Sequence, residues 1–159
     1  MKKCMIIFAA VLTAGFFSCK KESATSATTL NVRLTDAPGN YDSVIVDIVA
    51  VMVHSDQSGW VTMNMPSPGR YDLLRYANGL DTLIASSTIP AGNVSQIRLI
   101  LGSGNSVCKN GVSYPLTVPS GSESGLKLQI HKEMVEGVTN IIQLDFDAGR
   151  SVVETGNGS

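Results

Sequence analysis

The sequence predicts an all-β protein, an antiparallel β-sandwich of seven or eight short strands. Three observations predict this fold class. Apolar and polar residues alternate with a period of two over most of the chain. Clusters rich in Gly, Pro, Asn, Asp and Ser separate the alternating runs. Only 16% of the 159 residues are charged and Gly occurs 15 times, which argues against a helical bundle.

The first half of the folded region contains four expected elements. Residues 30–35 alternate cleanly and predict a strand with one face in the core and one in solvent. Residues 44–53 are apolar on both faces except at Asp47, so we expect a central strand that is covered on both sides. Residues 60–65 predict a further strand. Residues 71–76 predict either a short strand or one helical turn, and their pattern does not separate the two.

The second half is expected to form four more strands, at residues 82–89, 96–101, 126–131 and 141–147. A shorter hairpin is expected between them. Asn110 and Gly111 separate the short apolar runs 107–108 and 112–114, and an Asn-Gly pair in this position is typical of a two-residue hairpin turn.

The N-terminus combines a basic start with the apolar residues 5–17. Thirteen residues rise about 20 Å as a helix, less than the roughly 30 Å of a bilayer core, so this stretch predicts an export signal rather than a membrane span. The sequence Phe16-Phe17-Ser18-Cys19 resembles the lipobox of bacterial lipoproteins, although Phe16 stands where Leu is usual and Phe17 where a small residue is commoner. The resemblance implies cleavage before Cys19, lipidation of its sulfur and acylation of its amine with palmitate or a similar fatty acid. The alternative is an ordinary secretory signal with an incidental cysteine.

These features divide the chain into a lipoprotein signal peptide (1–18), a flexible tether (19–28), a β-sandwich domain (29–155) and a short tail (156–159). Two or three acyl chains hold a protein stably on a membrane, so we expect a lipid-anchored protein of the cell envelope. The expected location is the outer membrane, on either its periplasmic or its exposed surface. Cys108 then remains as a single thiol, and the domain has no internal disulfide.

Motifs in the folded region occur in a fixed order: Leu34-Thr35-Asp36-Ala37-Pro38, Tyr41-Asp42-Ser43-Val44, Ile89-Pro90-Ala91-Gly92, Gln96-Ile97-Arg98-Leu99, Pro119-Ser120-Gly121 and Ser124-Gly125-Leu126-Lys127-Leu128. Together they resemble bacterial domain of unknown function 4382, found in exported lipoproteins, mostly of Bacteroidota. The resemblance implies a sandwich of the immunoglobulin or prealbumin type, similar to carbohydrate-binding modules, and no activity or site residues. It also implies one more hydrophobic strand after residues 151–158. Because the sequence ends at Ser159, we expect that it is truncated; the alternative is a sheet without its closing strand.

The chemistry-bearing residues do not predict a catalytic or metal site, and we expect no enzyme activity and no cofactor. Neither His54 nor His131 has a ligand partner at metal-binding spacing, and Cys108 is expected to be a small buried hydrophobe. The carboxylates that a calcium ion would need are Asp36, Asp42, Asp47, Asp145 and Asp147. We favour structural roles for them, with Asp36 in a capped turn and the last two facing Arg33, Arg98 or Lys127 across the sheet.

Aromatic and basic residues are the candidate ligand-binding groups, because sugar rings stack on flat aromatic faces. The candidates are Trp60, Tyr71, Tyr76, Arg98 and Lys127. For Trp60 we favour a place in the core, as in many sandwiches, over a place at the rim. A net charge of −1 with no basic stripe excludes a nucleic-acid partner. The sequence therefore predicts an envelope binding module whose partner is a glycan or an envelope protein. The first alternative is a structural or assembly role with another envelope protein, and the second is an envelope enzyme.

Overall fold

The computed structural model describes residues 26–119 and 124–154, so Cys19 and the predicted signal and tail lie outside the described residues. The described part has ten strands: β1 (Ala27–Asp36), β2 (Ser43–Ser55), β3 (Gly59–Thr62), β4 (Gly69–Asp72), β5 (Thr82–Pro90), β6 (Gly92–Leu101), β7 (Ser106–Lys109), β8 (Val112–Pro115), β9 (Leu126–Met134) and β10 (Thr139–Phe146). A single turn of 3-10 helix, η1 (Leu73–Tyr76), follows β4, and a four-residue helix, α1 (Ala148–Ser151), follows β10. Within these residues no helix is long and apolar enough to cross a membrane.

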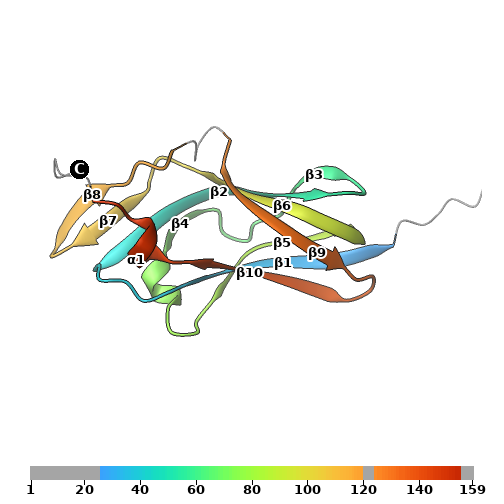
Figure 1. Ribbon diagram of the computed structural model, residues 1–159, viewed down its shortest axis with the longest axis horizontal. Helices are drawn as coiled ribbons and strands as arrows, with labels where there is room; N and C mark the ends of the chain where they lie inside the picture. The colour runs from blue at the N-terminus through green and yellow to red at the C-terminus, as the bar shows by residue number, and fades with distance from the viewer. Residues whose placement is uncertain (1–25, 120–123, 155–159) are drawn as a thin grey trace, which may run out of the picture.

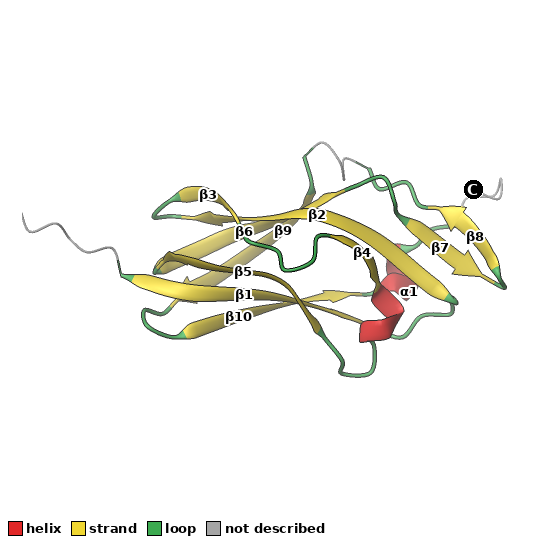
Figure 2. Cartoon of the chain, turned by 180° about the vertical axis from the view of Figure 1, so that it is seen from behind, coloured by secondary structure: helices red, strands yellow, loops and turns green. Residues whose placement is uncertain are grey.

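The strands form two layers (Figure 1). The small sheet has the order β10-β1-β5, and the large sheet is built around β2. On one side β2 pairs with β6 and β7, which continue to β9 and β8; on the other side it pairs with the short strands β3 and β4. Figure 2 shows the same two layers from behind, with the β7–β8 hairpin at the end opposite the start of β1. The predicted all-β sandwich is confirmed.

The topology differs from the expectation in two respects. Ten strands form rather than seven or eight, because the Asn-Gly hairpin contributes two short strands and residues 69–72 pair with β2. The pair β1–β10 is parallel, with Thr29 opposite Thr139 and Asp36 opposite Phe146, whereas every other described pair is antiparallel. Strand β1 also begins at Ala27, two residues before the expected start of the domain.

The core lies between the two layers and follows the alternation of the sequence. Leu30, Val32 and Leu34 of β1 are fully buried, and Ile97 and Leu99 of β6 face them from the large sheet. Burying one such side chain contributes about 1.5–3 kcal/mol relative to leaving it in water. The sandwich is thus held together by the inward half of each strand, and the outward half is free for other roles.

Strand β2 is central, as predicted, but its outer face is not covered by another layer. Its buried residues change from even to odd numbers along the strand: Val44, Val46 and Ile48, then Val51 and Val53. The register with β6 shifts between Ile48 and Ala50, which marks a β-bulge. The bulge turns the side-chain alternation by one residue and leaves Val49 46% exposed. The bulge brings Val51 and Val53 into the core, whereas Ile45, Val49 and Met52 are apolar side chains that point outward. The expectation of cover on both sides was wrong, because no second layer of the described residues packs on this outward side.

Two local predictions have clear outcomes. Residues 71–76 contain both predicted conformations, since β4 ends at Asp72 and η1 begins at Leu73. The hairpin prediction is confirmed: Asn110 and Gly111 have φ angles of 53° and 76°, and positive φ at both positions is the requirement of a type I′ turn.

A candidate binding face on the large sheet

Two rows of side chains cross the outer face of the large sheet. In the first row Trp60 of β3 is opposite His54 of β2, which is opposite Gln96 of β6, which is opposite Gln129 of β9. The second row, one step along the strands, is made by Thr62, Met52, Arg98 and Lys127. We call these eight residues the outer face. Three inter-strand steps separate β3 from β9, a width of about 14 Å.

Trp60 lies on this face and not in the core. Its side chain follows the turn after β2, where Gly59 has a φ of 66°, and the register places it opposite His54. Since Val53 and Ser55 are buried, His54 and its partner must point outward. Trp60 remains 38% exposed, and the preference for a core position was wrong.

Trp60 is packed against two neighbours from adjacent strands. The His54 ring meets it edge to face, with ring centroids 5.1 Å apart and an interplanar angle of 66°. The guanidinium carbon of Arg98 lies 3.9 Å from the centroid of the indole ring, a cation–π contact. The His54 Nδ1 atom is in turn 3.0 Å from the hydroxyl of Ser95. The indole is thus held in place, with one of its two faces covered by a cation.

Arg98 and Lys127 give the outer face its charge. The Nε–H of Arg98 donates to the Oε1 atom of Gln96 over 3.0 Å, which fixes the guanidinium plane. Lys127 is exposed and directly opposite Arg98 across the β6–β9 pair. Among the described residues, neither cation forms an ion pair with a carboxylate. Two like charges therefore lie side by side without a counter-charge.

A model of the family described as domain of unknown function DUF4382 matches residues 27–159. The chain belongs to this family. The match begins at the first residue of β1 and includes both sheets, so the outer face is part of the DUF4382 domain itself. No curated protein matches the chain.

The DUF4382 domain separates the five residues that the sequence suggests as ligand-binding. Trp60, Arg98 and Lys127 come together on the outer face. Tyr71 on β4 is only 7% exposed, and its hydroxyl donates to the carbonyl of Ser67. Burial raises the pKa of this hydroxyl. Tyr76 is half-buried in η1 and packs against the core, so neither tyrosine joins the outer face.

His54 and Gln96 were missed as members of this face by the sequence analysis. The signal that could have found them is the alternation itself. In β6, Ile97 and Leu99 point inward, so Gln96 and Arg98 must point outward together. The hairpin between β2 and β3 would then have placed His54 beside Trp60, had its register been known.

The carboxylates of the DUF4382 domain have local structural partners. The buried Asp36 accepts the backbone N–H of Ala148 over 3.0 Å, and burial raises the pKa of its carboxyl group. Asp42 accepts the backbone N–H of Gly111 over 2.7 Å and lies 3.7 Å from the thiol of Cys108. Within the described ranges no three His, Cys, Asp or Glu side chains are grouped as a metal ion would require.

The ion pairs differ from those expected for the last strand. Arg33 binds Asp81 rather than Asp145, with its Nε–H 2.8 Å from the Oδ1 atom. This contact lowers the pKa of the Asp81 carboxyl group. Asp147 caps α1 by accepting the backbone N–H of Arg150 over 3.1 Å. Asp145 lies on β10 opposite Thr35 of β1, but the guanidinium of nearby Arg33 is held by Asp81, and Arg98 and Lys127 lie on the large sheet, which β10 does not join. No ion pair of the described residues links Asp145 or Asp147 to these three cations, so the expectation was wrong.

Proposed function

We propose that this DUF4382 protein is a lipid-anchored binding module of the bacterial cell envelope that holds a glycan on the outer face of its large sheet. One observation carries the proposal: the partly exposed Trp60 is held between His54 and Arg98 among polar side chains on the outer face of the sheet. A large aromatic side chain that is partly exposed and already ordered loses little entropy on binding. The amides of Gln96 and Gln129 lie in the same row and can hydrogen-bond sugar hydroxyls.

The proposed anchor is the lipidated Cys19, which lies outside the described residues. The signal-like N-terminus supports it, since two or three acyl chains on one residue suffice for stable attachment. Seven residues (20–26) would then separate the anchor from Ala27, where β1 begins. In this arrangement the tether holds the sandwich close to a membrane, and the outer face contacts glycans within its reach.

The glycan proposal is tested with the full-length protein in detergent on a glycan array. We expect saturable retention of a subset of glycans, loss of that retention in Trp60→Ala, and unchanged retention in Tyr114→Ala. Tyr114 is the matched control because it is an exposed aromatic residue on β8, which pairs only with β7 in the described part. Retention that survives Trp60→Ala, or that is absent for every glycan, would overturn the proposal.

The anchor is tested separately by metabolic labelling with a palmitate analogue. We expect label on the wild-type protein in the envelope fraction and no label on Cys19→Ala. A labelled Cys19→Ala protein, or an unlabelled wild-type protein in the cytosol, would contradict the proposed anchor without bearing on glycan binding.

A role in assembly with another envelope protein is the second candidate, and one observation favours it. Among the described strands, β10 stands at the end of the small sheet, and Ile141 on this strand and Val135 and Val138 in the turn before it are exposed. An end strand with exposed apolar side chains is a surface on which a partner strand can pair. In this case one envelope protein would co-purify with the wild type and not with Ile141→Lys, and Trp60→Ala would leave the co-purification unchanged.

A further inference from the structure

We infer that the ligand of the outer face is an acidic glycan, whose carboxylate, sulfate or phosphate groups are bound by Arg98 and Lys127. This inference rests on the proposed function, because it names the class of glycan for the same face. It is argued from the charges of the face, the geometry of Arg98 and the limited exposure of the indole.

The outer face carries a pair of positive charges that no carboxylate of the described residues balances. Arg98 and Lys127 are direct partners across the β6–β9 ladder, and like charges at such positions destabilise a sheet. Of the eight basic side chains of the described residues, four hold carboxylates, in the pairs Arg33–Asp81, Arg75–Asp72, Lys109–Glu154 and Arg150–Asp147. Arg98 and Lys127 are among the other four, and they are direct cross-strand partners. An anionic ligand would relieve the repulsion that the sheet itself leaves uncompensated.

Arg98 is held in one orientation by two neighbouring side chains. Its guanidinium lies against the indole of Trp60 and its Nε–H is bonded to Gln96. A guanidinium has five N–H donors, and no other described hydrogen bond uses the remaining four. Its planar fork matches the two oxygens of a carboxylate, or two oxygens of a phosphate or sulfate. Because the side chain is already ordered, binding an anion costs little further entropy.

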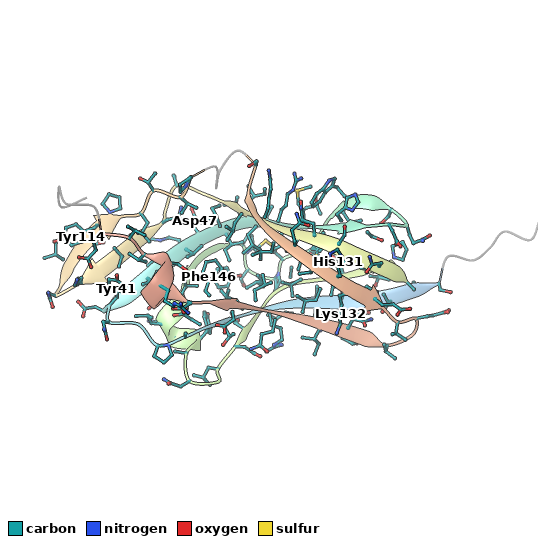
Figure 3. All side chains as sticks on the ribbon, viewed as in Figure 1. Tyr41, Asp47, Tyr114, His131, Lys132 and Phe146 are labelled. Carbon is teal, nitrogen blue, oxygen red and sulfur yellow. The ribbon has the colours of Figure 1, made fainter. Side chains whose placement is uncertain are left out.

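Trp60 offers a neutral sugar only part of its ring. Arg98 covers one face of the indole, so a neutral sugar could stack only on the part of the ring that remains exposed. An acidic sugar gains the same partial stacking and also a charge-assisted hydrogen bond to Arg98. The side chains drawn in Figure 3 show His131 on β9, the strand that carries Lys127, and this residue adds a further polar group at the edge of the sheet.

The face suits a glycan better than an anionic membrane surface. Each cation near such a surface contributes about 1 kcal/mol, and recognition usually needs four to eight of them, whereas the outer face has two. Acidic side chains also lie where the tether enters the sandwich. Glu133 and Glu136 line a hollow of about 520 Å³ together with Ser26, the first described residue.

The test uses the fluorescence of Trp60, which reports on this face alone because the chain has a single Trp. Full-length protein in neutral detergent is titrated with a panel of acidic polysaccharides, each matched with its neutral form, such as polygalacturonate and its methyl ester. We expect at least ten-fold tighter binding of one or more acidic forms, and weakening of that binding as NaCl is raised. Lys127→Gln should reduce the acidic affinity several-fold and change the neutral affinity less than two-fold. Arg98→Gln should also reduce the acidic affinity several-fold, whereas its neutral affinity should not fall, because this variant uncovers the indole face that Arg98 occupies.

Lys132→Gln is the matched control, because Lys132 is an exposed cation on β9 that belongs to neither row of the outer face. It should leave the preference for the acidic form unchanged, and circular dichroism should show that all variants keep the wild-type strand content. Equal affinity for acidic and neutral forms would overturn the inference and leave the glycan proposal standing. Absence of binding to every glycan would overturn both. An Arg98-dependent response to phosphatidylglycerol vesicles, with none to any acidic polysaccharide, would overturn the inference in favour of lipid headgroups.

Discussion

The replacement Thr28→Val tests how the start of β1 is fastened to the rest of the sandwich, at the point where the tether enters it. The buried hydroxyl of Thr28 donates to the carbonyl of Val138 over 2.7 Å and accepts the side-chain N–H of Asn140 over 2.7 Å. Asn140 is itself buried and also donates to the carbonyl of Val135. This small network joins β1 to the turn between β9 and β10.

Valine has nearly the same shape as threonine and removes only the hydroxyl. The replacement breaks one donated and one accepted hydrogen bond, each with a net value of about 1 kcal/mol. The Asn140 amide keeps its bond to the carbonyl of Val135 and a longer one, of 3.5 Å, to the carbonyl of Val138, so both groups retain a partner. We therefore expect the free energy of unfolding to fall by about 2 kcal/mol.

The assay is urea unfolding followed by far-ultraviolet circular dichroism. For a slope near 2 kcal/mol/M, the expected loss lowers the midpoint by about 1 M. The control is Thr29→Val, since Thr29 is adjacent on the same strand and its side chain takes part in none of these bonds; its stability should change by less than about 0.5 kcal/mol. If Thr28→Val is no less stable than Thr29→Val, the network does not fasten the strand and the argument fails.

Three further predictions concern backbone space and charge. A Cβ atom at Gly102 would overlap the Oδ2 atom of Asp47, which accepts the backbone N–H of Gly104. Gly102→Ala must displace this carboxylate from that bond, so it should cost about 1–3 kcal/mol in urea unfolding. Burial raises the pKa of the Asp36 carboxyl group, so the ionised carboxylate destabilises the folded state at pH values above the ordinary pKa of 3.8. As the pH falls from 7 towards 4, the free energy of unfolding of wild type should rise relative to that of Asp36→Asn. Arg33 lowers the pKa of the Asp81 carboxyl group, so the ion pair stabilises the fold at pH values above the ordinary pKa of 3.8. Urea unfolding should show Arg33→Gln to be less stable than wild type at pH 7, and the difference should disappear as the pH falls below 3.8 and through the lowered pKa.

The strands could be predicted where one face of the sheet is buried and the alternation is regular. Leu30, Val32 and Leu34 of β1 and Ile142 and Leu144 of β10 point inward as their spacing indicates. Pairing is a different matter, because alternation fixes which face a residue occupies and not which strand lies beside it. The parallel pair β1–β10 joins segments more than 100 residues apart, and no local signal in either strand specifies it.

Two wrong predictions, the cover of β2 and the position of Trp60, concern which face of the sheet a residue occupies. A bulge between Ile48 and Ala50 changes the inward set of β2, and the strand pattern does not reveal it. The same uncertainty hides the position of Trp60. Placing it requires the hairpin register with His54, and a shift of one residue would have turned the indole into the core.

The two faces of β6 have different roles, which explains how one strand can contribute to both stability and binding. Its inward residues Ile97 and Leu99 are fully buried, so substitutions there change core packing and cost stability. Its outward residues Gln96 and Arg98 contact each other, Arg98 also contacts Trp60, and neither side chain belongs to the core. Substitutions on the outer face can therefore alter which ligand is bound without unfolding the sandwich. For this reason Arg98→Gln separates the chemistry of the face from the fold, whereas a substitution at Leu99 would confound the two.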